Sequence, residues 1–573
     1  MNIDRPNIIV NHVGFFIDEA KHALFPASAA GEFELQDMLQ VDEEAPLGAF
    51  ENWRVVWRGQ LAPAPEGERR RGDFSAWRRP GVYRLTLPNG GGRSLMFTIH
   101  DGILADLPPL FLDYMNGIRC GAHENRWRCP CHLDDGVLSV SGQQIDATGG
   151  WHDAGDTRKW MTHATLPALA LVEYVERQQP DARRGDYLAE IEWGVRFILK
   201  MQDPATGMIY EDVGGGRDTR RREGMTWWYE NLSGCYADNF DNRFTDNIPR
   251  SGDERPVREQ YNPMVQYVNS VILLKSAAWL DEPLAARARG AAWACWQFTE
   301  RQPPDERAAV QAWRLLAALA MQQTAAMEHA LDKLLDLWSP QTGFWFMDRE
   351  KQDFHRGVWN SAQPLLALAE WADKMPGHPR RQRIEQVVNQ CVRDYVLPMS
   401  ATNDFGLMPY GRYCRPATVG DRYREWPGGG CFRYYMPNHS VQRVNHGLGG
   451  HWTSWAWALA RCATVFDLPA CRQVALDQLY WLLGNNPAQA SFVSGIGYNN
   501  PMPHSRAYGC LLGGFMVGPR GDAADEFHAD TAGHADWSTC EYWSLVGAQT
   551  VLALSHLLPR AVPNQRKLGS TVI

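Results

Sequence analysis

The sequence contains no run of about 20 apolar residues and no block of basic side chains. A transmembrane helix needs such an apolar run. Proteins that bind nucleic acid usually concentrate Lys and Arg, whereas here 57 basic residues are outnumbered by 66 acidic ones, for a net charge of −9. We therefore expect no membrane-spanning segment and no nucleic-acid partner.

The N-terminal sequence MNIDRPNIIVNHVGFF lacks the pattern of a signal peptide, a charged segment followed by an apolar run of roughly 7–15 residues. The 12 cysteines are scattered, and several lie in apolar helical patterns such as AAWACWQF and LARCATVF. This distribution favours buried free thiols over a disulfide framework. We therefore expect a protein of a reducing compartment, the cytoplasm.

By contrast, the chain is long and rich in aromatic residues. The 573 residues allow two or more domains around a large core. The 24 tryptophans are more than such a core needs. Because the indole ring is large and amphipathic, it suits the lining of a concave ligand site.

The sequence pattern of the first hundred residues predicts a small β-sandwich. Short runs rich in Val, Ile, Phe, Trp and Thr alternate with Gly, Pro and Asn turns. These runs are NIIVNHVGFF, FELQD, NWRVVWRGQL, GVYRLTLP and RSLMFTIHDG.

From about Trp160 onward, apolar periodicity predicts roughly a dozen helices. Several of them, including VQYVNSVILLKSAAWL, are apolar on most faces, which predicts burial on both sides and favours a double ring of helices over a simple bundle. Two long loops rich in Gly, Pro and aromatics interrupt the helices, one from 214 to 261 and one beginning at FGLMPYGRY. Loops of this length and content are expected to be ordered and to face a ligand.

The stretch GGWHDAGDTRKW carries two aspartates, Asp153 and Asp156, three residues apart. One interpretation is that either aspartate caps a helix beginning near Thr157. The other is a pair of reactive carboxylates, which raise each other's pKa when they lie close together.

Two further stretches carry polar side chains of the kinds used in catalysis and ligand binding. FHADTAGHADWSTCEYWSLVGAQ places Glu541 at the start of an apolar helix, where the helix dipole alone would favour a carboxylate. The Gly/Asn/Pro loop ending in PMPHSR presents His504 and Arg506 two residues apart, which aims two donors at a hydroxylated ligand.

Together and in this order, the three motifs resemble glycoside hydrolase family nine, in the subgroup with an N-terminal immunoglobulin-like domain. DAGD is similar to the family's base motif, LLGNNP…PMPHSR to its histidine signature and HADWSTCEYW to its acid motif. The chain departs from the pattern at Trp537, where the family usually has Tyr, and before His504, where one residue is missing. The resemblance implies an immunoglobulin-like β-sandwich over residues 1–102 and an all-α (α/α)6 barrel over residues 103–573.

By the same resemblance, the chain is an inverting glycosidase acting on β-1,4-linked oligosaccharides. Asp156 is then the general base, Asp153 helps to hold the attacking water, and Glu541 is the general acid, whose pKa must be raised. Residues expected to contact the sugar are His504, Arg506, Asp530 and Asp536, with Trp426 and Tyr435 and the further ring candidates Trp227, Trp228 and Tyr434 from the two loops.

A metal site is predicted beside the base motif. The stretch RCGAHENRWRCPCHLDDG and the histidine before Asp153 supply Cys120, Cys131, His132 and His152, a Cys2His2 set suited to closed tetrahedral zinc. Cys131 is preferred to Cys129 because similar family members use an adjacent Cys-His pair. The alternative is free thiols beside a surface histidine. Calcium also occurs in the family, but no residues here point to its place.

For the substrate, we expect exo action on short cello-oligosaccharides or glucosamine oligosaccharides, with the 214–261 loop closing one end of the cleft. Asp134 and Asp135 are candidates to meet a substrate ammonium group. One alternative is an endo-β-1,4-glucanase acting on soluble glucan. The other is a non-catalytic sugar-binding protein of the same fold. The sequence makes no prediction of the oligomeric state.

Overall fold

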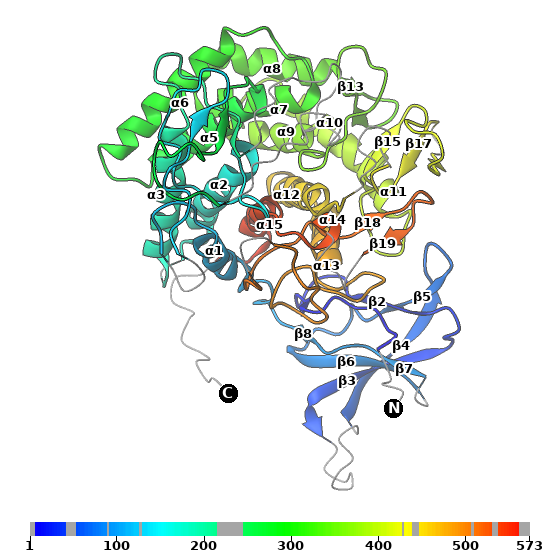
Figure 1. Cartoon of the computed structure of the whole chain (residues 1–573). Coiled ribbons are helices and arrows are strands. Elements are labelled where there is room, and N and C mark those ends of the chain that lie inside the picture. The colour runs from blue at the N-terminus through cyan, green and yellow to red at the C-terminus, as the bar shows by residue number, and fades with distance from the viewer. Residues whose placement is uncertain are drawn as a thin grey trace.

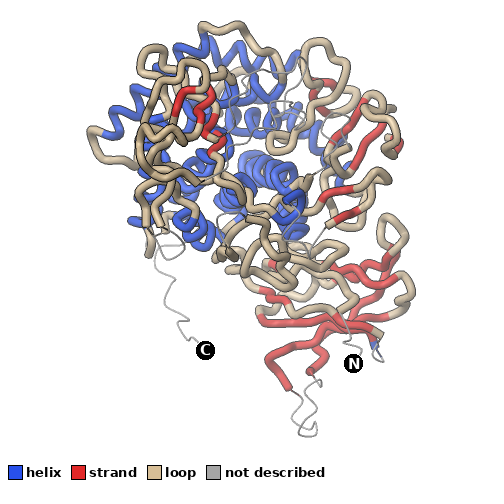
Figure 2. Tube along the Cα trace, in the orientation of Figure 1, coloured by secondary structure: helices blue, strands red, loops and turns tan. Residues whose placement is uncertain are grey.

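The computed structural model describes residues 6–41, 53–88, 91–124, 129–180, 182–214, 244–426, 429–437, 446–505, 509–529 and 537–560. A sheet-rich N-terminal part lies against one side of a much larger helical part (Figures 1 and 2). Within these ranges, no helix combines the length and apolar character needed to cross a membrane.

The N-terminal part is a single hydrogen-bonded path of eight strands, in the order β1-β8-β6-β3-β4-β5-β2 with β7 beside β6. The strands are β1 Gly14–Phe15, β2 His22–Pro26, β3 Glu32–Val41, β4 Trp53–Pro63, β5 Arg69–Asp73, β6 Gly81–Leu87, β7 Gly92–Arg93 and β8 Phe97–Ile99. The first part of β4 pairs with β3, whereas its end, Leu61 to Pro63, pairs with β5. Because one strand changes partners, the path folds over on itself, and Phe25, Phe33 and Leu35 are buried inside it. This is the immunoglobulin-like sandwich that was predicted.

Helices dominate the chain after β8. Their bounds are α1 Leu107–Gly117, α2 Met161–Gln178, α3 Arg184–Lys200, α5 Pro263–Ala277, α6 Leu284–Glu300, α7 Ala308–Ala320, α8 Thr324–Asp336, α9 Gln363–Lys374, α10 Arg381–Cys391 with the π-helical turn η2 Val392–Val396, α11 Leu397–Ser400, α12 Gly449–Phe466, α13 Pro469–Leu482, α14 Trp537–Cys540 and α15 Ser544–Leu557. The domain boundary predicted after residue 102 falls between β8 and α1 and stays a prediction.

Six of these helices form a closed inner ring. Each packs on the next in the order α2, α5, α7, α9, α12 and α15, and α15 packs back on α2. The helices α3, α6, α8, α10 and α13 lie outside this ring, each against an inner helix. Inner helices are buried on nearly every face, as the all-round apolar patterns predicted. The expected (α/α)6 barrel is therefore confirmed.

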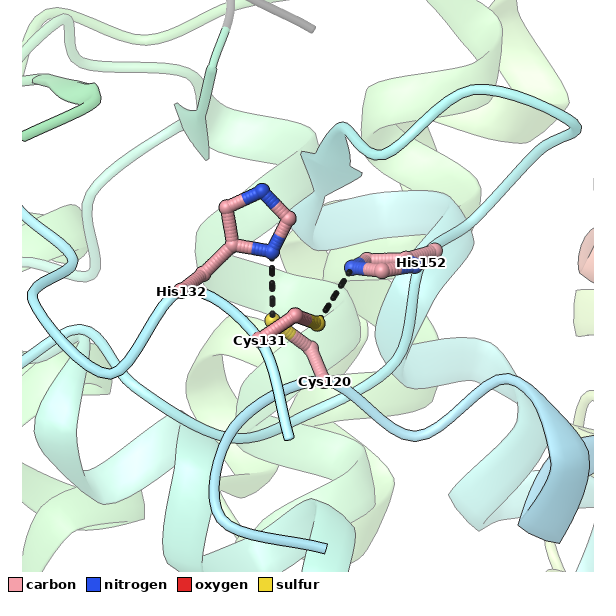
Figure 3. Close-up of side chains that lie close together, drawn as sticks. All are labelled: Cys120, Cys131, His132 and His152. Atoms are coloured by element: carbon pink, nitrogen blue, oxygen red, sulfur yellow. Dashed lines mark hydrogen bonds between the residues drawn. The ribbon is translucent and has the colours of Figure 1, made fainter. Parts of the chain in front are cut away.

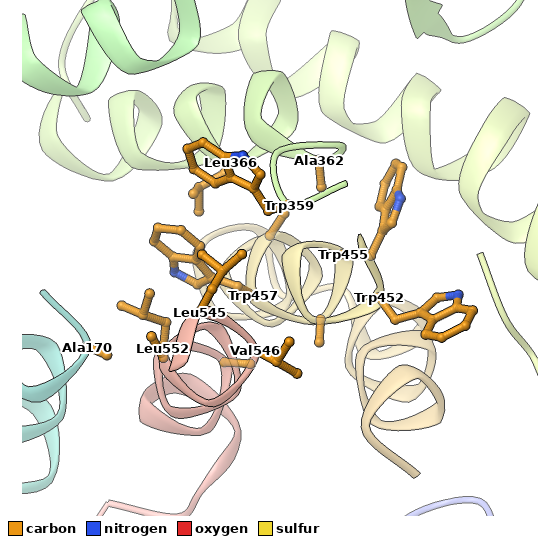
Figure 4. Packing of buried hydrophobic residues seen from close by; sticks show 14 of the residues in the cluster. Ala170, Trp359, Ala362, Leu366, Trp452, Trp455, Trp457, Leu545, Val546 and Leu552 are labelled. Carbon is orange, nitrogen blue, oxygen red and sulfur yellow. The ribbon is translucent and has the colours of Figure 1, made fainter. Parts of the chain in front are cut away.

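The centre of the ring is filled by large aromatic and aliphatic side chains (Figure 4). Trp457 of α12 and Leu545 and Leu552 of α15 point into this core, with Trp359 at the entry to α9. All four are at most 4% exposed. Many of the tryptophans therefore build the barrel, contrary to the expectation that their number mainly serves a ligand site.

Short strands and loops connect the helices at one end of the ring. The strands are β9 Val137–Leu138, β10 Lys159–Trp160, β11 Asp212–Val213, β12 Pro256–Arg258, β13 Trp338–Ser339, β14 Phe344–Trp345, β15 Gly411–Tyr413, β16 Arg424–Glu425, β17 Cys431–Arg433, β18 Arg520–Gly521 and β19 Phe527–His528. The sheet β10-β11-β12-β9 pairs segments that lie far apart in the chain, with Val137 opposite Pro256, and its strand β10 ends directly before α2.

The two parts of the chain dock closely. His12 of the sandwich lies against Gly484 and Gly497, where an added Cβ would come within 2.4 Å and 2.8 Å of His12 atoms. The Tyr480 hydroxyl of α13 donates to the Glu19 carboxylate at 2.8 Å. These contacts fix the sandwich against the outer helix α13.

Candidate active site

Asp153 and Asp156 lie on a tight turn just before β10. Asp153 is buried, at 4% exposure, and its Oδ1 accepts the backbone N–H of Trp160 at 2.8 Å. Asp156 is half-buried, and its Oδ1 accepts the N–H of Arg158 at 3.1 Å. The helix-cap interpretation is wrong, because α2 begins only at Met161, with no side-chain cap on its first turn.

Three separate motifs meet at Gly155, the glycine between the two aspartates. A Cβ added there would lie 2.3 Å from the carbonyl oxygen of His504 and 2.9 Å from Cγ of Glu541. His504 in turn donates its N–H to the Cys540 carbonyl at 3.0 Å. Ser505 donates its hydroxyl to the Gly155 carbonyl at 3.1 Å. The base, histidine and acid motifs therefore share one place, and only glycine fits between them.

Glu541 lies in the three-residue link between α14 and α15, not within the apolar helix itself. Its side chain is 9% exposed, and its Oε2 accepts the indole N–H of Trp543 at 2.9 Å. The Trp543 ring stacks on His163 and lies 5.0 Å from the ring of His446. Burial lowers the pKa of His163 to about 3 and that of His446 to about 4, so both imidazoles are neutral near pH 7. The acid candidate therefore lies beside a cluster of aromatic and neutral imidazole rings.

Charged groups lie close to the aspartate turn. Burial, followed by the charge of Asp156, raises the pKa of Asp153 well above its usual value. The Arg158 side chain lies over the Trp160 ring and donates to Asp212 Oδ2 at 2.7 Å. Arg258 donates to the same oxygen at 2.8 Å. The sequence analysis did not predict this buried network. The signal that the sequence contains is the presence of charged residues in or beside the short strands β10, β11 and β12.

The other predicted sugar contacts divide into two groups. The first group lies outside the described residues and consists of Arg506, Asp530, Asp536, Trp227 and Trp228. Among the described ones, Trp426 is partly buried, with its ring 6.1 Å from Phe432. Tyr434 and Tyr435 are buried, and both line a cavity between the sandwich and the barrel.

The four predicted zinc ligands come together beside the aspartate turn (Figure 3). All four are buried, and their donor atoms lie within 4.8 Å of one another. Cys120 Sγ is 3.7 Å from His132 Nδ1, and Cys131 Sγ is 3.8 Å from His152 Nε2. Tetrahedral bonds of about 2.3 Å to sulfur and about 2.0 Å to nitrogen require separations of about 3.5 Å. The residues therefore fit zinc with little movement.

Electrostatics at this cluster also suit a metal that prefers thiolate. Burial on its own would raise the pKa of Cys120, but the Cys131 thiol, Lys159 and the two histidines together lower it well below its usual value. A lowered pKa favours the thiolate form, which is the form that binds zinc.

The expectation that Asp135 meets a substrate ammonium is wrong. Its side chain has no exposed surface and is held by Arg255 at 2.6 Å and by Lys159 at 2.8 Å. Asp134 is also buried, at 3% exposure, and accepts the hydroxyl of Thr245. Asp134, Asp246 and Asp253 bring carboxylate oxygens within 4.8 Å of one another, a donor set that suits a hard cation such as calcium.

Comparison with known proteins decides the family. The model of glycosyl hydrolase family 9 matches residues 110–544. The chain belongs to glycosyl hydrolase family 9. It is 22% identical to Endoglucanase D of Acetivibrio thermocellus over 587 residues, which cover 94% of this chain and 83% of that protein.

Solved structures show the same fold for this family 9 chain. A metagenome-derived family 9 endoglucanase has a TM-score of 0.68 at 19% identity and covers 96% of this chain and 98% of its own. A zinc-binding triple mutant of the family 9 endoglucanase J30 has a TM-score of 0.65 at 18% identity, with 95% and 99% covered. Both alignments span the sandwich and the barrel, so these two structures share the pairing of the two parts.

Proposed function

We propose that this family 9 chain is an endo-β-1,4-glucanase that cleaves soluble glucan with inversion. The observation that carries the proposal is the meeting of Asp153, Asp156 and Glu541 around Gly155. An inverting glycosidase needs two such carboxyl groups at one place, one to activate water and one to protonate the leaving oxygen. A non-catalytic sugar-binding protein has no need for this arrangement.

The similar proteins favour internal cleavage over the exo action expected from the sequence. Endoglucanase D and the metagenome-derived enzyme are both named as endoglucanases. The loop that was expected to close one end of the cleft lies, over residues 215–243, outside the described residues. Exo action on cello-oligosaccharides or glucosamine oligosaccharides therefore becomes the second outcome of the test below.

In the proposed mechanism, Asp156 is the general base. Its carboxylate is partly exposed, so water can reach it, and the Arg158 N–H fixes one of its oxygens. Asp153 is anchored more firmly, through Trp160 on its carboxylate and through Ser544 on its carbonyl. The two aspartates accept hydrogen bonds from the two O–H groups of one water, and as that water attacks the anomeric carbon, Asp156 takes one of its protons.

Glu541 is the proposed general acid. Trp543 holds the carboxyl group in one orientation through Oε2, and the proposed role requires that this carboxyl be protonated when substrate binds. Protonated Glu541 donates to the glycosidic oxygen as the bond to the anomeric carbon breaks. Attack by water from the opposite face then inverts the configuration, which requires a separation of about 6.5–9.5 Å between base and acid carboxyls.

We further propose that Cys120, Cys131, His132 and His152 hold a structural zinc ion. All four donors come from the protein, which leaves no position for substrate or water. His152 directly precedes Asp153, so the bound ion would fix the backbone from which the base turn begins.

The test is a product analysis on two series of oligosaccharides, from disaccharide to hexasaccharide, one of cello-oligosaccharides and one of chitosan oligosaccharides. We expect mid-length products from the longer cello-oligosaccharides, little cleavage of cellobiose and a rapid loss of viscosity with carboxymethylcellulose. Stepwise release of monosaccharide from either series would instead establish exo action and name the sugar. Proton NMR of the first-formed anomer checks inversion independently of either result.

A further inference from the structure

Two short stretches of backbone carry the proposed reactive groups, and they pair with each other. The first is the base turn, residues 153–158, and the second is the acid segment, residues 541–543. Ala154 of the base turn pairs with Trp543 of the acid segment in an antiparallel bridge. The next residue, Ser544, begins α15 and has no exposed surface. Contacts between these two stretches therefore help to set how far apart the base and the acid lie.

Ser544 donates to the base turn through both of its polar hydrogens. Its backbone nitrogen lies 2.9 Å from the Asp153 carbonyl oxygen, and its hydroxyl oxygen lies 3.0 Å from the same atom. The hydroxyl oxygen is also 3.2 Å from the carbonyl oxygen of His163, in the first turn of α2. A hydroxyl has one proton, so these two carbonyls share it. One side chain thus links α15, α2 and the base turn.

The Ser544 hydroxyl is used differently from that of most serines at the start of a helix. Such a serine usually accepts a hydrogen bond from the first N–H groups of its own helix. In α15 the N-cap residue is Trp543, which makes no such bond, and the Ser544 hydroxyl donates outward to a carbonyl 391 residues away in the chain. Removal of this hydroxyl should therefore act on its outside partners and leave the helix intact.

The acid segment is also fixed from its other side, independently of Ser544. The Trp543 N–H donates to the Phe515 carbonyl at 2.8 Å, and the Glu541 carbonyl accepts the Val517 N–H, also at 2.8 Å. The Glu541 carboxyl group accepts the Trp543 indole N–H at 2.9 Å. All of these bonds remain when the Ser544 hydroxyl is removed, so the acid should keep its place.

The base turn, by contrast, is closed by bonds within its own part of the chain. Asp153 donates its N–H to the Arg158 carbonyl at 3.1 Å, and its carboxylate accepts the N–H of Trp160 at 2.8 Å. These bonds keep the shape of the turn but do not fix its position against the acid. That position depends on donors from other segments, among them the hydroxyls of Ser505 and Ser544.

We propose that Ser544 is a positioning residue, which holds the base turn at the separation from Glu541 that the reaction needs. The inference rests on the proposed function, in which Asp156 activates water and Glu541 protonates the leaving oxygen. Inversion needs a carboxyl separation of about 6.5–9.5 Å, with room for one water, and a misplacement of about 1 Å lowers the rate about 10²-fold. Ser544 is buried and acts only through the Asp153 carbonyl and its neighbours.

Steady-state kinetics of Ser544→Ala in the full chain tests the proposal, because alanine removes the hydroxyl and keeps the backbone N–H. We expect kcat on glucan to fall about tenfold, the effect of one lost hydrogen bond, with KM within twofold of the parent. Ser555→Ala is the matched control. Ser555 is a buried serine of the same helix, and its hydroxyl donates to the Val551 carbonyl within α15. Its kcat should stay within twofold of the parent.

A second substrate, β-cellobiosyl fluoride, shows which group has moved. Fluoride leaves with little help from the acid, but the attacking water must still be activated by the base. If Ser544→Ala displaces the base turn, the rates on glucan and on the fluoride should fall by the same factor. A loss confined to glucan would place the change at the acid, and unchanged rates on both substrates would deny the hydroxyl any role; either result overturns the proposal. A parent chain that hydrolyses neither substrate would refute the proposed function itself, and the role of Ser544 with it.

Discussion

His152 and Asp153 are neighbours in the chain, yet they belong to groups of opposite character. His152 joins three other donors that are all buried and all supplied by the protein. Asp153 shares its turn with Asp156, whose carboxylate keeps a partly exposed surface. The closed group suits a structural ion, whereas the open pair suits a reaction with an incoming water. One short segment thus joins a rigid support to a reactive turn.

The largest effect should follow from a change in the open group. Glu541→Gln removes the proton that the leaving oxygen needs, so we expect kcat on glucan to fall about 10³-fold with little change in KM. Aryl glycosides with good leaving groups need less protonation, and their hydrolysis should fall much less. Steady-state kinetics on both substrates measures the difference. Full turnover of glucan by the variant would contradict the assignment of Glu541.

A change in the closed group should act on stability first. Cys131→Ser removes one of four donors, and we expect loss of bound zinc and a loss of stability on the order of 5 kcal/mol. Metal analysis of the purified protein and its half-life at elevated temperature measure both effects. Cys129→Ser is the matched control, because Cys129 is exposed and is not part of the metal group. Equal zinc content in the two variants would sink the four-ligand proposal.

The same contrast explains what the sequence could predict. Cysteine and histidine are rare, and zinc accepts few other donors, so a cluster of them near one motif predicted a metal group, and the family's adjacent Cys-His pair selected Cys131 over Cys129. All-round apolar patterns likewise predicted the inner helices, because a helix that is apolar on most faces must be covered on both sides.

Partners far apart in the chain could not be predicted. Asp135 was placed in the substrate site because it is an acidic residue near the base motif, but it pairs with Arg255, 120 residues away. Tyr435 was proposed as a sugar platform of the cleft, but the fold places it in the wall of the cavity between the domains. A side chain's exposure depends on segments that local pattern does not contain. The cytoplasmic location and the contacts of Arg506, Asp530 and Asp536 stay predictions.

Gly155 lies where the reactive groups meet, so adding one methyl group tests how tightly they are held. Gly155→Ala would press on the His504 carbonyl and on Glu541. Overpacking of this kind destabilises by about 1–3 kcal/mol, and a displacement of about 1 Å between the carboxyls lowers kcat about 10²-fold. Gly185→Ala is the control, because nothing lies within 4 Å of its added methyl. Equal activity of the two variants would show that the turn is not closely held.

The smallest effect should come from Glu19, an acid between the sandwich and α13 whose burial outweighs the nearby charge of Lys21. Burial raises the pKa of Glu19 to about 8, against the lowering effect of the Tyr480 hydroxyl that donates to it. The folded protein therefore holds a proton that the unfolded chain releases above its ordinary pKa of about 4.5. The resulting stability is fully present below pH 4.5 and is lost as the pH rises to about 8. Glu19→Gln keeps the shape and cannot release the proton, so its unfolding temperature should fall less over this window, by a few degrees. Parallel curves for Glu19→Gln and the parent chain would mean that the contact between the sandwich and α13 does not respond to pH.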